Sequence, residues 1–303
     1  MSTGGKITNN WRNAALSRAY TNDSTYTQPT KFKVGIGTTT PTVNDTDLEI
    51  AVPIENGTII DAGTAVMTGY LSADSSTSNT AYYKEGGGLT DVTAQSLIKS
   101  STATNESLWS LESLSTTVSN DQPYGCWFRI ASGTAYDSLD SNTAVEVRIG
   151  SSTANYYRDT YTKASVTAGW NWLTSNTANV STLTEVGSVS TTAIATFGLY
   201  VVSSTATDTY TSNNLTYDLF RQWEPSDLLG SLVSGYPSLD TTNIRVTLRY
   251  YLTSIQGNGF PLTEVGAYNT DDTSIMSSRD VFDSISKSLT DEVAIEIKDS
   301  MED

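Results

Sequence analysis

The stretch Val145-Glu146-Val147-Arg148-Ile149 alternates apolar and charged side chains. Alternation with a period of two places the apolar residues on one face of a β-strand and the charged residues on the other. Clusters of Gly, Asn, Ser and Thr separate this stretch from other short strand-like segments. These segments span 107–111, 124–130, 155–161, 171–173, 193–202 and 215–220. The pattern predicts an antiparallel β-sandwich over this part of the chain, and not an α/β fold.

The two ends of the chain are also rich in predicted strands. Before the sandwich, strand-like runs cover 29–37, 50–54 and 65–71, and after it they cover 244–252, 262–268, 278–282 and 293–297. Residues 10–20 carry three Ala residues and one Leu and predict a short helix, and 226–232 predict one or two helical turns. We therefore expect a mainly β chain with few short helices.

The chain of 303 residues contains no histidine and one cysteine, Cys126. The absence of histidine excludes Ser-His-Asp and Cys-His nucleophile systems, HExxH zinc sites and histidine-based facial triads. A single cysteine cannot form an internal disulfide. Cys126 lies in the apolar run Gly-Cys-Trp-Phe, which predicts a buried thiol in the core.

The charge balance also narrows the set of partners. The chain has 33 Asp and Glu residues and 17 Lys and Arg residues, which gives a net charge of −16. Binding to nucleic acid requires a basic surface, and adhesion to an anionic membrane also requires a basic surface. We therefore predict neither partner. No apolar stretch approaches the ~20 residues of a membrane span, and the first residues show no apolar core of a signal peptide. The acidity favours solubility at high local concentration.

Two distant segments resemble a module of tailed-phage particles. Residues 33–49, KVGIGTTTPTVNDTDLE, are similar to the "GTGTTxPTxxDTxLE" loop near the start of many tail-fibre and virion structural proteins. Residues 262–269, LTEVGAYN, and 278–287, SRDVFDSISK, resemble the matching "TEVGLFN…ARxxFxxIxK" segment. The chain departs from this pattern at Ile36 and at Ala267-Tyr268, with no change in its chemistry.

The resemblance implies a domain organisation. In shorter relatives the two segments lie close together in one β-rich module, whereas a long insertion separates them in this chain. The resemblance thus implies a discontinuous base domain, 1–75 and 225–303, and an inserted domain at 76–224. The order of segments in the insertion is similar to that of concanavalin-type or laminin-G-like jelly rolls. The glycine run 86–88 is interpreted as a linker into it.

The resemblance also implies a function. It indicates a bacteriophage virion structural protein, made in the host cytoplasm, that acts as a tail-fibre or tail attachment component. Its partners would be other virion proteins, in a homo-oligomer with a trimer favoured, and the jelly roll would engage host-surface glycans. A capsid decoration or head-fibre protein is the alternative, and the sequence does not separate the two.

Tyrosines provide the candidate binding site. Flat aromatic faces stack against sugar rings, and we predict Tyr156, Tyr157 and Tyr161 as glycan-binding residues. Their alternative role is in the core or rim of the sandwich, because tyrosine combines an apolar ring with a polar end. The nearby Trp170 is predicted to lie in the core.

Carboxylate pairs are the remaining candidates for chemistry. A glycan depolymerase would need two carboxylates about 5–9 Å apart, and the candidates are Asp137 with Asp140, or Glu146 with Asp159 and Asp218. Any acidic β protein offers such pairs, so we predict no enzyme, no catalytic residue and no cofactor. Calcium held by Asp137, Asp140 or Asp159 is a further alternative, but no EF-hand spacing is present and no metal site is predicted.

Overall fold

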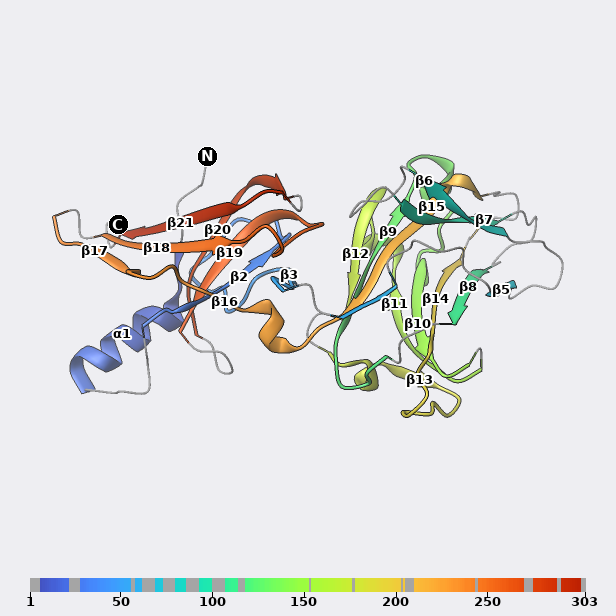
Figure 1. The fold of residues 1–303 in the computed structure, drawn as a ribbon, viewed down its shortest axis with the longest axis horizontal. Coiled ribbons are helices and arrows are strands. Elements are labelled where there is room, and N and C mark those ends of the chain that lie inside the picture. Colours follow the sequence, from blue (N-terminus) through green and yellow to red (C-terminus); the bar gives the residue numbers. More distant parts are fainter. Residues whose placement is uncertain are drawn as a thin grey trace. The chain divides into compact units, whose positions relative to one another are not determined.

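The computed structural model describes residues 6–21, 28–55, 58–61, 69–72, 80–85, 93–99, 107–113, 118–152, 154–175, 178–202, 204, 210–242, 245–269, 275–287 and 290–300. Within these ranges the chain is mainly β, as predicted, and every strand pair is antiparallel (Figure 1). The chain divides into a base unit, residues 1–57 and 223–303, and a sandwich unit, residues 58–222. The predicted linker at 86–88 lies outside the described residues.

The sandwich unit consists of two sheets. The first, named the β9 sheet, has the order β12-β9-β15-β7-β6, with β4 paired to β15. Its strands are β4 (Thr58–Asp61), β6 (Thr80–Glu85), β7 (Thr93–Lys99), β9 (Tyr124–Ile130), β12 (Gly169–Thr174) and β15 (Tyr210–Gln222). The second, named the β10 sheet, has the order β13-β11-β10-β14-β8-β5. Its strands are β5 (Gly69–Ser72), β8 (Ser107–Ser113), β10 (Val145–Gly150), β11 (Tyr156–Tyr161), β13 (Thr184–Val186) and β14 (Thr196–Val202).

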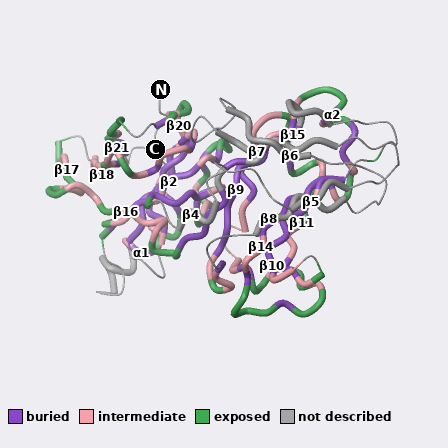
Figure 2. Tube along the Cα trace, turned by 45° about the vertical axis from the view of Figure 1, so that its right-hand side comes forward, coloured by how far each residue is buried: buried purple, intermediate pink, exposed green. Residues whose placement is uncertain are grey.

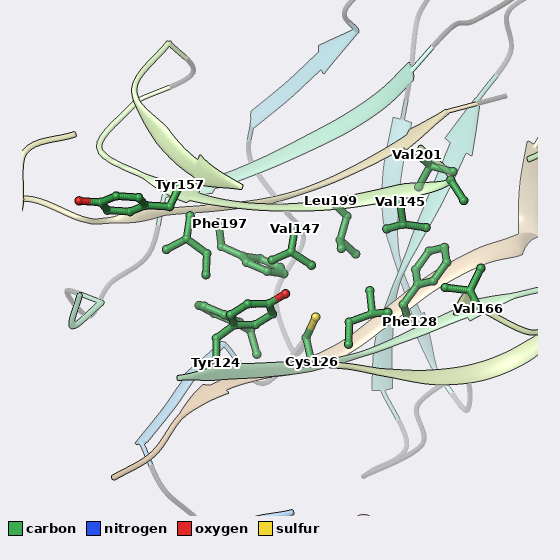
Figure 3. Close-up of a cluster of buried hydrophobic side chains, with 14 of the residues drawn as sticks. Tyr124, Cys126, Phe128, Val145, Val147, Tyr157, Val166, Phe197, Leu199 and Val201 are labelled. Carbon is green, nitrogen blue, oxygen red and sulfur yellow. The ribbon is translucent and has the colours of Figure 1, made fainter. Parts of the chain in front are cut away.

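The core of the sandwich unit lies between these sheets. Val147 and Leu199 of the β10 sheet point toward Cys126 of the β9 sheet (Figure 3). The rings of Phe197 and Phe220 stack with their centroids 4.1 Å apart. Burial raises the pKa of the Cys126 thiol, and Cys126 is the buried core residue that the sequence predicted. Figure 2 shows buried chain along the strands and exposed chain mostly in their connections.

The sandwich unit begins earlier in the chain than the sequence indicated. The predicted boundary at residue 76 assigned the run at 65–71 to the base. In the structure β4 pairs with β15, and β5 pairs with β8, so both strands belong to the sandwich. The boundary lies at residue 58. Strand propensity marks a segment as a strand but does not specify its hydrogen-bonding partner.

The base unit also contains two sheets. The β19 sheet has the order β1-β20-β19-β2-β16, with β3 paired to β2, and the β18 sheet has the order β17-β18-β21. Their strands are β1 (Lys6–Ile7), β2 (Lys31–Gly35), β3 (Ala51–Val52), β16 (Gly230–Ser231), β17 (Ser238–Asp240), β18 (Arg245–Leu252), β19 (Pro261–Tyr268), β20 (Met276–Ser286) and β21 (Val293–Ser300). The helix α1 (Asn9–Thr21) matches the helix predicted at 10–20. At 226–232 the structure has a short 3-10 helix, Pro225–Leu228, followed by β16.

The segments 33–49 and 262–287 meet in the β19 sheet. Strand β2 pairs with β19, with Val34 opposite Val265 and Gly35 opposite Glu264. Strand β19 in turn pairs with β20. Segments from opposite ends of the sequence are therefore neighbouring strands of one sheet, and the base is discontinuous with an inserted sandwich.

A buried carboxylate joins the two segments. Glu264 is fully buried, and its Oε1 atom accepts hydrogen bonds from the backbone N–H groups of Gly37 at 3.0 Å and Ile50 at 2.9 Å. Its Oε2 atom accepts one from the N–H of Glu49 at 3.2 Å. The same oxygen lies 2.8 Å from Nη2 of Arg279. Glu264 thus holds the loop that follows β2 onto the face of β19.

Arg279 extends this network to the far side of the loop. Its Nη1 atom lies 2.8 Å from a carboxylate oxygen of Asp45. Burial opposes ionisation of Asp45, but hydrogen bonds from Thr42 and the charge of Arg279 keep its pKa below the ordinary value. Burial also opposes the charged form of Arg279, which by itself would lower the pKa of this arginine. The hydrogen bonds to Asp45 and Glu264 and the charges of these two carboxylates outweigh burial, so the pKa of Arg279 is raised. Asp45 and Arg279 are therefore both charged at neutral pH.

Two glycines of the motif allow this close approach. A Cβ atom at Gly35 would lie 2.4 Å from Oε1 of Glu264 and 2.5 Å from the carbonyl oxygen of Ile50. A Cβ atom at Gly37 would lie 2.6 Å from the same Glu264 oxygen. All three distances are shorter than the contacts that real Cβ atoms make, so the glycines make room for the buried carboxylate.

A second carboxylate lies between the two sheets of the base unit. Burial, together with the negative charge of Asp280, raises the pKa of Asp299 to about 6. The phenol of Tyr250 faces the same region, and burial and the charge of Asp299 raise its pKa as well. An ionised Asp299 is therefore unfavourable in the folded base unit.

This arrangement predicts that Asp299→Asn stabilises the protein at neutral pH. The pKa of Asp299 is raised on folding, so its protonation favours the native state and this stabilisation is lost as the pH rises from about 4 through about 6. We expect Asp299→Asn to add on the order of 1–2 kcal/mol at pH 7.5 and almost nothing at pH 4. Urea unfolding at both pH values checks this. The exposed Asp283→Asn is the control, and an equal effect of both variants at pH 7.5 would contradict the prediction.

Candidate functional site

The outward face of the β10 sheet, on the side opposite the core, carries a charged and aromatic cluster. Val145, Val147 and Ile149 of β10 belong to the core. The alternating residues Glu146 and Arg148 therefore lie on the outward face. The register places Tyr200 of β14 opposite Glu146, and Arg158 and Tyr156 of β11 opposite Arg148 and Gly150. We name Glu146, Arg148, Tyr156, Arg158 and Tyr200 the outward cluster.

Arg148 is the centre of the outward cluster. Its guanidinium carbon lies 3.7 Å from the ring centroid of Tyr200 and 4.7 Å from that of Tyr156. Planar guanidinium groups stack on aromatic rings through cation–π attraction. The two rings and the guanidinium therefore restrict one another's orientation.

Glu146 binds both arginines of the cluster. Its Oε2 atom accepts hydrogen bonds from Nε and Nη2 of Arg148, at 2.9 and 2.6 Å. Its Oε1 atom lies 3.5 Å from Nη1 of Arg158. The side chains of Glu146 and Arg148 are only 5% and 10% exposed, whereas that of Arg158 is 41% exposed. A ligand on this face would therefore meet Arg158 and the half-buried Tyr200 first.

The three predicted tyrosines do not form one site. Tyr156 lies in the outward cluster, but Tyr157 belongs to the core, where it lies at the edge with its hydroxyl directed away (Figure 3). Tyr161 packs against the core, and its hydroxyl donates to Asp159 at 3.0 Å. The hydroxyl of Tyr124 also donates to this carboxylate, at 2.9 Å. The grouping is corrected because residues 156 and 157 of one strand point to opposite faces.

The cluster contains residues that the sequence did not single out. Glu146 was named only as a candidate catalytic acid, and Arg148 and Tyr200 were not named as binding residues. Alternation in β10 placed Arg148 outward, but nothing local to β14 indicated that Tyr200 lies opposite Glu146. That contact depends on strand pairing between distant segments.

Three of the carboxylates considered for catalysis, Glu146, Asp159 and Asp218, are not brought together. Glu146 lies on the outward face of the β10 sheet, while Asp159, opposite the core residue Val147, points inward. Asp218 lies in β15 of the other sheet and is fully buried. These three carboxylates therefore cannot flank one glycosidic bond. The Oδ1 atom of Asp140 accepts bonds from two backbone N–H groups in the turn that follows it.

The aromatic residues of β12 lie on the other sheet. Trp172 is largely buried and packs against Trp127, with ring centroids 5.2 Å apart. The sequence predicted Trp170 to lie in the core. In the structure Trp170 is half-buried and does not belong to the core cluster of the sandwich unit. Neither tryptophan belongs to the outward cluster.

The described residues contain neither a cluster of metal ligands nor a helix that could span a membrane. No group of three or more Asp, Glu or Cys side chains in those ranges is placed to hold a metal ion. The helices in the same ranges also lack the length and hydrophobicity of a membrane-spanning segment.

Comparisons with known proteins give structural similarity alone. No family model matches the sequence, and no curated protein matches it. The fold is similar to a family 11 carbohydrate-binding module from Clostridium thermocellum in complex with a β-1,3-1,4-mixed-linked tetrasaccharide, with 11% identity and a TM-score of 0.37 over 55% of this chain and 94% of that one. It is also similar to a xylan-binding domain of Xyn10C from Paenibacillus barcinonensis, with 11% identity and a TM-score of 0.29 over 56% of this chain and 97% of that one.

Proposed function

We propose that this protein is an attachment component of a tailed-phage particle. In this proposal the base unit docks on other virion proteins, and the sandwich unit binds a host-surface glycan through its outward cluster. The observation that carries the binding role is Arg148, stacked between Tyr156 and Tyr200 on the outward face of a sheet.

The geometry of the outward cluster suits a saccharide. Sugars present flat C–H faces and a rim of hydroxyl groups, so they are bound by aromatic rings held beside planar hydrogen-bonding groups. Glu146 and Arg148 hold each other through two hydrogen bonds in a nearly buried position. Buried charges cost free energy unless they are paired. Such a pair beneath two rings orders the binding surface before the ligand arrives, which reduces the entropy lost on binding.

Removal of the half-buried Tyr200 ring tests the binding role. We expect Tyr200→Ala to weaken binding to glycans in envelope extracts of the host by about tenfold, because one stacking contact is lost. The control is Tyr251→Ala, which removes a 40% exposed tyrosine from the base unit. Isothermal titration with extracted glycans measures both affinities. Equal affinities of Tyr200→Ala and the unmodified protein would contradict the proposed site.

The virion role rests on the two phage-like segments, which meet as β2, β19 and β20 around Glu264. We propose that the protein acts there as a homo-oligomer, with a trimer favoured, because several weak glycan contacts gain affinity through avidity. Immunogold labelling of particles tests this role. Label at one pole indicates a tail component, label over the shell indicates the alternative of a capsid decoration or head-fibre protein, and particles without label would refute both.

We propose that the protein binds these glycans without cleaving them. Incubation of the protein with the same glycans is expected to release no reducing ends. Release that is abolished by one carboxylate-to-amide substitution would instead indicate a depolymerase.

A further inference from the structure

The outward cluster has an unusual charge for this protein. Arg148 and Arg158 lie directly opposite each other across the β10–β11 pair. Like charges in directly opposed positions destabilise a sheet. The outward positions of β10, β11, β13 and β14 hold three charged residues, which are these two arginines and Glu146. The remaining outward positions are uncharged: Gly150, Tyr156, Thr160, Thr184, Val186, Thr196, Gly198, Tyr200 and Val202. The outward positions of these four strands thus carry one excess positive charge.

This excess contrasts with the rest of the chain. The whole protein has 33 acidic and 17 basic residues, so a positively charged sheet face runs against its composition. Glu146 is shared between both arginines: its Oε2 atom lies 2.6 Å from Nη2 of Arg148, and its Oε1 atom lies 3.5 Å from Nη1 of Arg158. Arg148 is enclosed by two rings and tightly bound, which leaves Arg158 as the cation available to a ligand.

We infer that the glycan bound by this face carries a carboxylate, as uronic or sialic acids do, and that Arg158 binds it. This inference rests on the proposed glycan-binding function and specifies its ligand class. The guanidinium of Arg158 presents several N–H donors in a planar fork that matches a carboxylate. In the structure its contact to Glu146 is long, at 3.5 Å, and its side chain is 41% exposed. A carboxylate beside Arg158 would also offset the charge that Glu146 leaves uncompensated.

A matched panel of saccharides tests the inference. The protein is applied to an array of uronate- and sialate-containing oligosaccharides printed beside their carboxyl-reduced forms, which keep the same rings and linkages but lack the charge. Positive binders are then measured by isothermal titration. We expect acidic forms to bind at least about tenfold more tightly than their reduced counterparts, and this preference to weaken as salt is raised.

Two substitutions connect this preference to Arg158. Arg158→Gln is expected to remove the preference for acidic forms while binding of the reduced forms stays unchanged. Arg158→Lys is expected to retain only part of it, because lysine keeps the charge but not the fork. Arg249→Gln in the base unit is the control, since Arg249 is 42% exposed and is also paired with a glutamate. Circular dichroism confirms that the variants are folded.

The possible results distinguish failure of the carboxylate assignment from failure of the proposed glycan-binding function. Equal binding of acidic and reduced forms, or an unchanged preference in Arg158→Gln, would overturn the carboxylate assignment while glycan binding stands. Failure of every saccharide on the array to bind would contradict the proposed function, and the inference would fall with it.

Discussion

Glu264→Gln is expected to destabilise the base unit by about 3–5 kcal/mol, the cost of removing one partner from a buried ion pair. The glutamine keeps the shape of the side chain but loses the charge that faces Arg279 at 2.8 Å. Glutamine has an NH₂ group in place of one carboxylate oxygen. This NH₂ group would face either Arg279 or backbone N–H groups that donate to Glu264 in the unmodified protein. Either orientation leaves buried donors without an acceptor.

Hydrogen exchange of β19 peptides and urea unfolding measure this loss. The matched control is Glu296→Gln, because Glu296 also pairs with an arginine, at 3.8 Å, but both side chains are about 40% exposed. An exposed ion pair contributes less than about 1 kcal/mol. Equal destabilisation by the two substitutions would show that the buried network does not hold the segments 33–49 and 262–287 together.

Phe197→Ala is expected to destabilise the sandwich unit by about 3–5 kcal/mol. Phe197 is fully buried, and its ring stacks on Phe220 across the core with an interplanar angle of 17°. Alanine removes the ring and leaves a cavity between two sheets whose strands are held by hydrogen bonds on both sides. The surrounding structure can therefore collapse only partly into the space.

Thermal and urea unfolding of Phe197→Ala measure the effect. Ile255→Ala is the control, since Ile255 is 61% exposed and its truncation should change stability by less than about 0.5 kcal/mol. A loss below about 1 kcal/mol for Phe197→Ala would mean that the core lies elsewhere than between the β9 and β10 sheets.

Local patterns predicted several elements of this protein correctly. Alternation in β10 identified which of its residues face the core, and Ala-rich sequence identified α1. The apolar neighbours of Cys126 indicated its burial. These predictions succeeded because each depends on residues within one turn or one strand.

The candidate site was predicted only in part. Tyr156 was selected because it is aromatic, and Tyr157 was selected with it, although consecutive strand residues face opposite ways. Tyr200 was missed because its place beside Arg148 depends on the register between β10 and β14. The sandwich boundary was misplaced for a related reason, since β4 and β5 find their partners far along the chain.

The amino-acid sequence by itself determined the mainly β character of the chain, the faces of its strongest strands and the exclusion of histidine chemistry. Only the tertiary structure decided that Glu264 and Arg279 meet the loop after β2, and that Arg148 lies between two tyrosines. The physical reason is that side-chain periodicity is a property of one segment, whereas strand pairing and its register are settled by packing among segments distant in sequence.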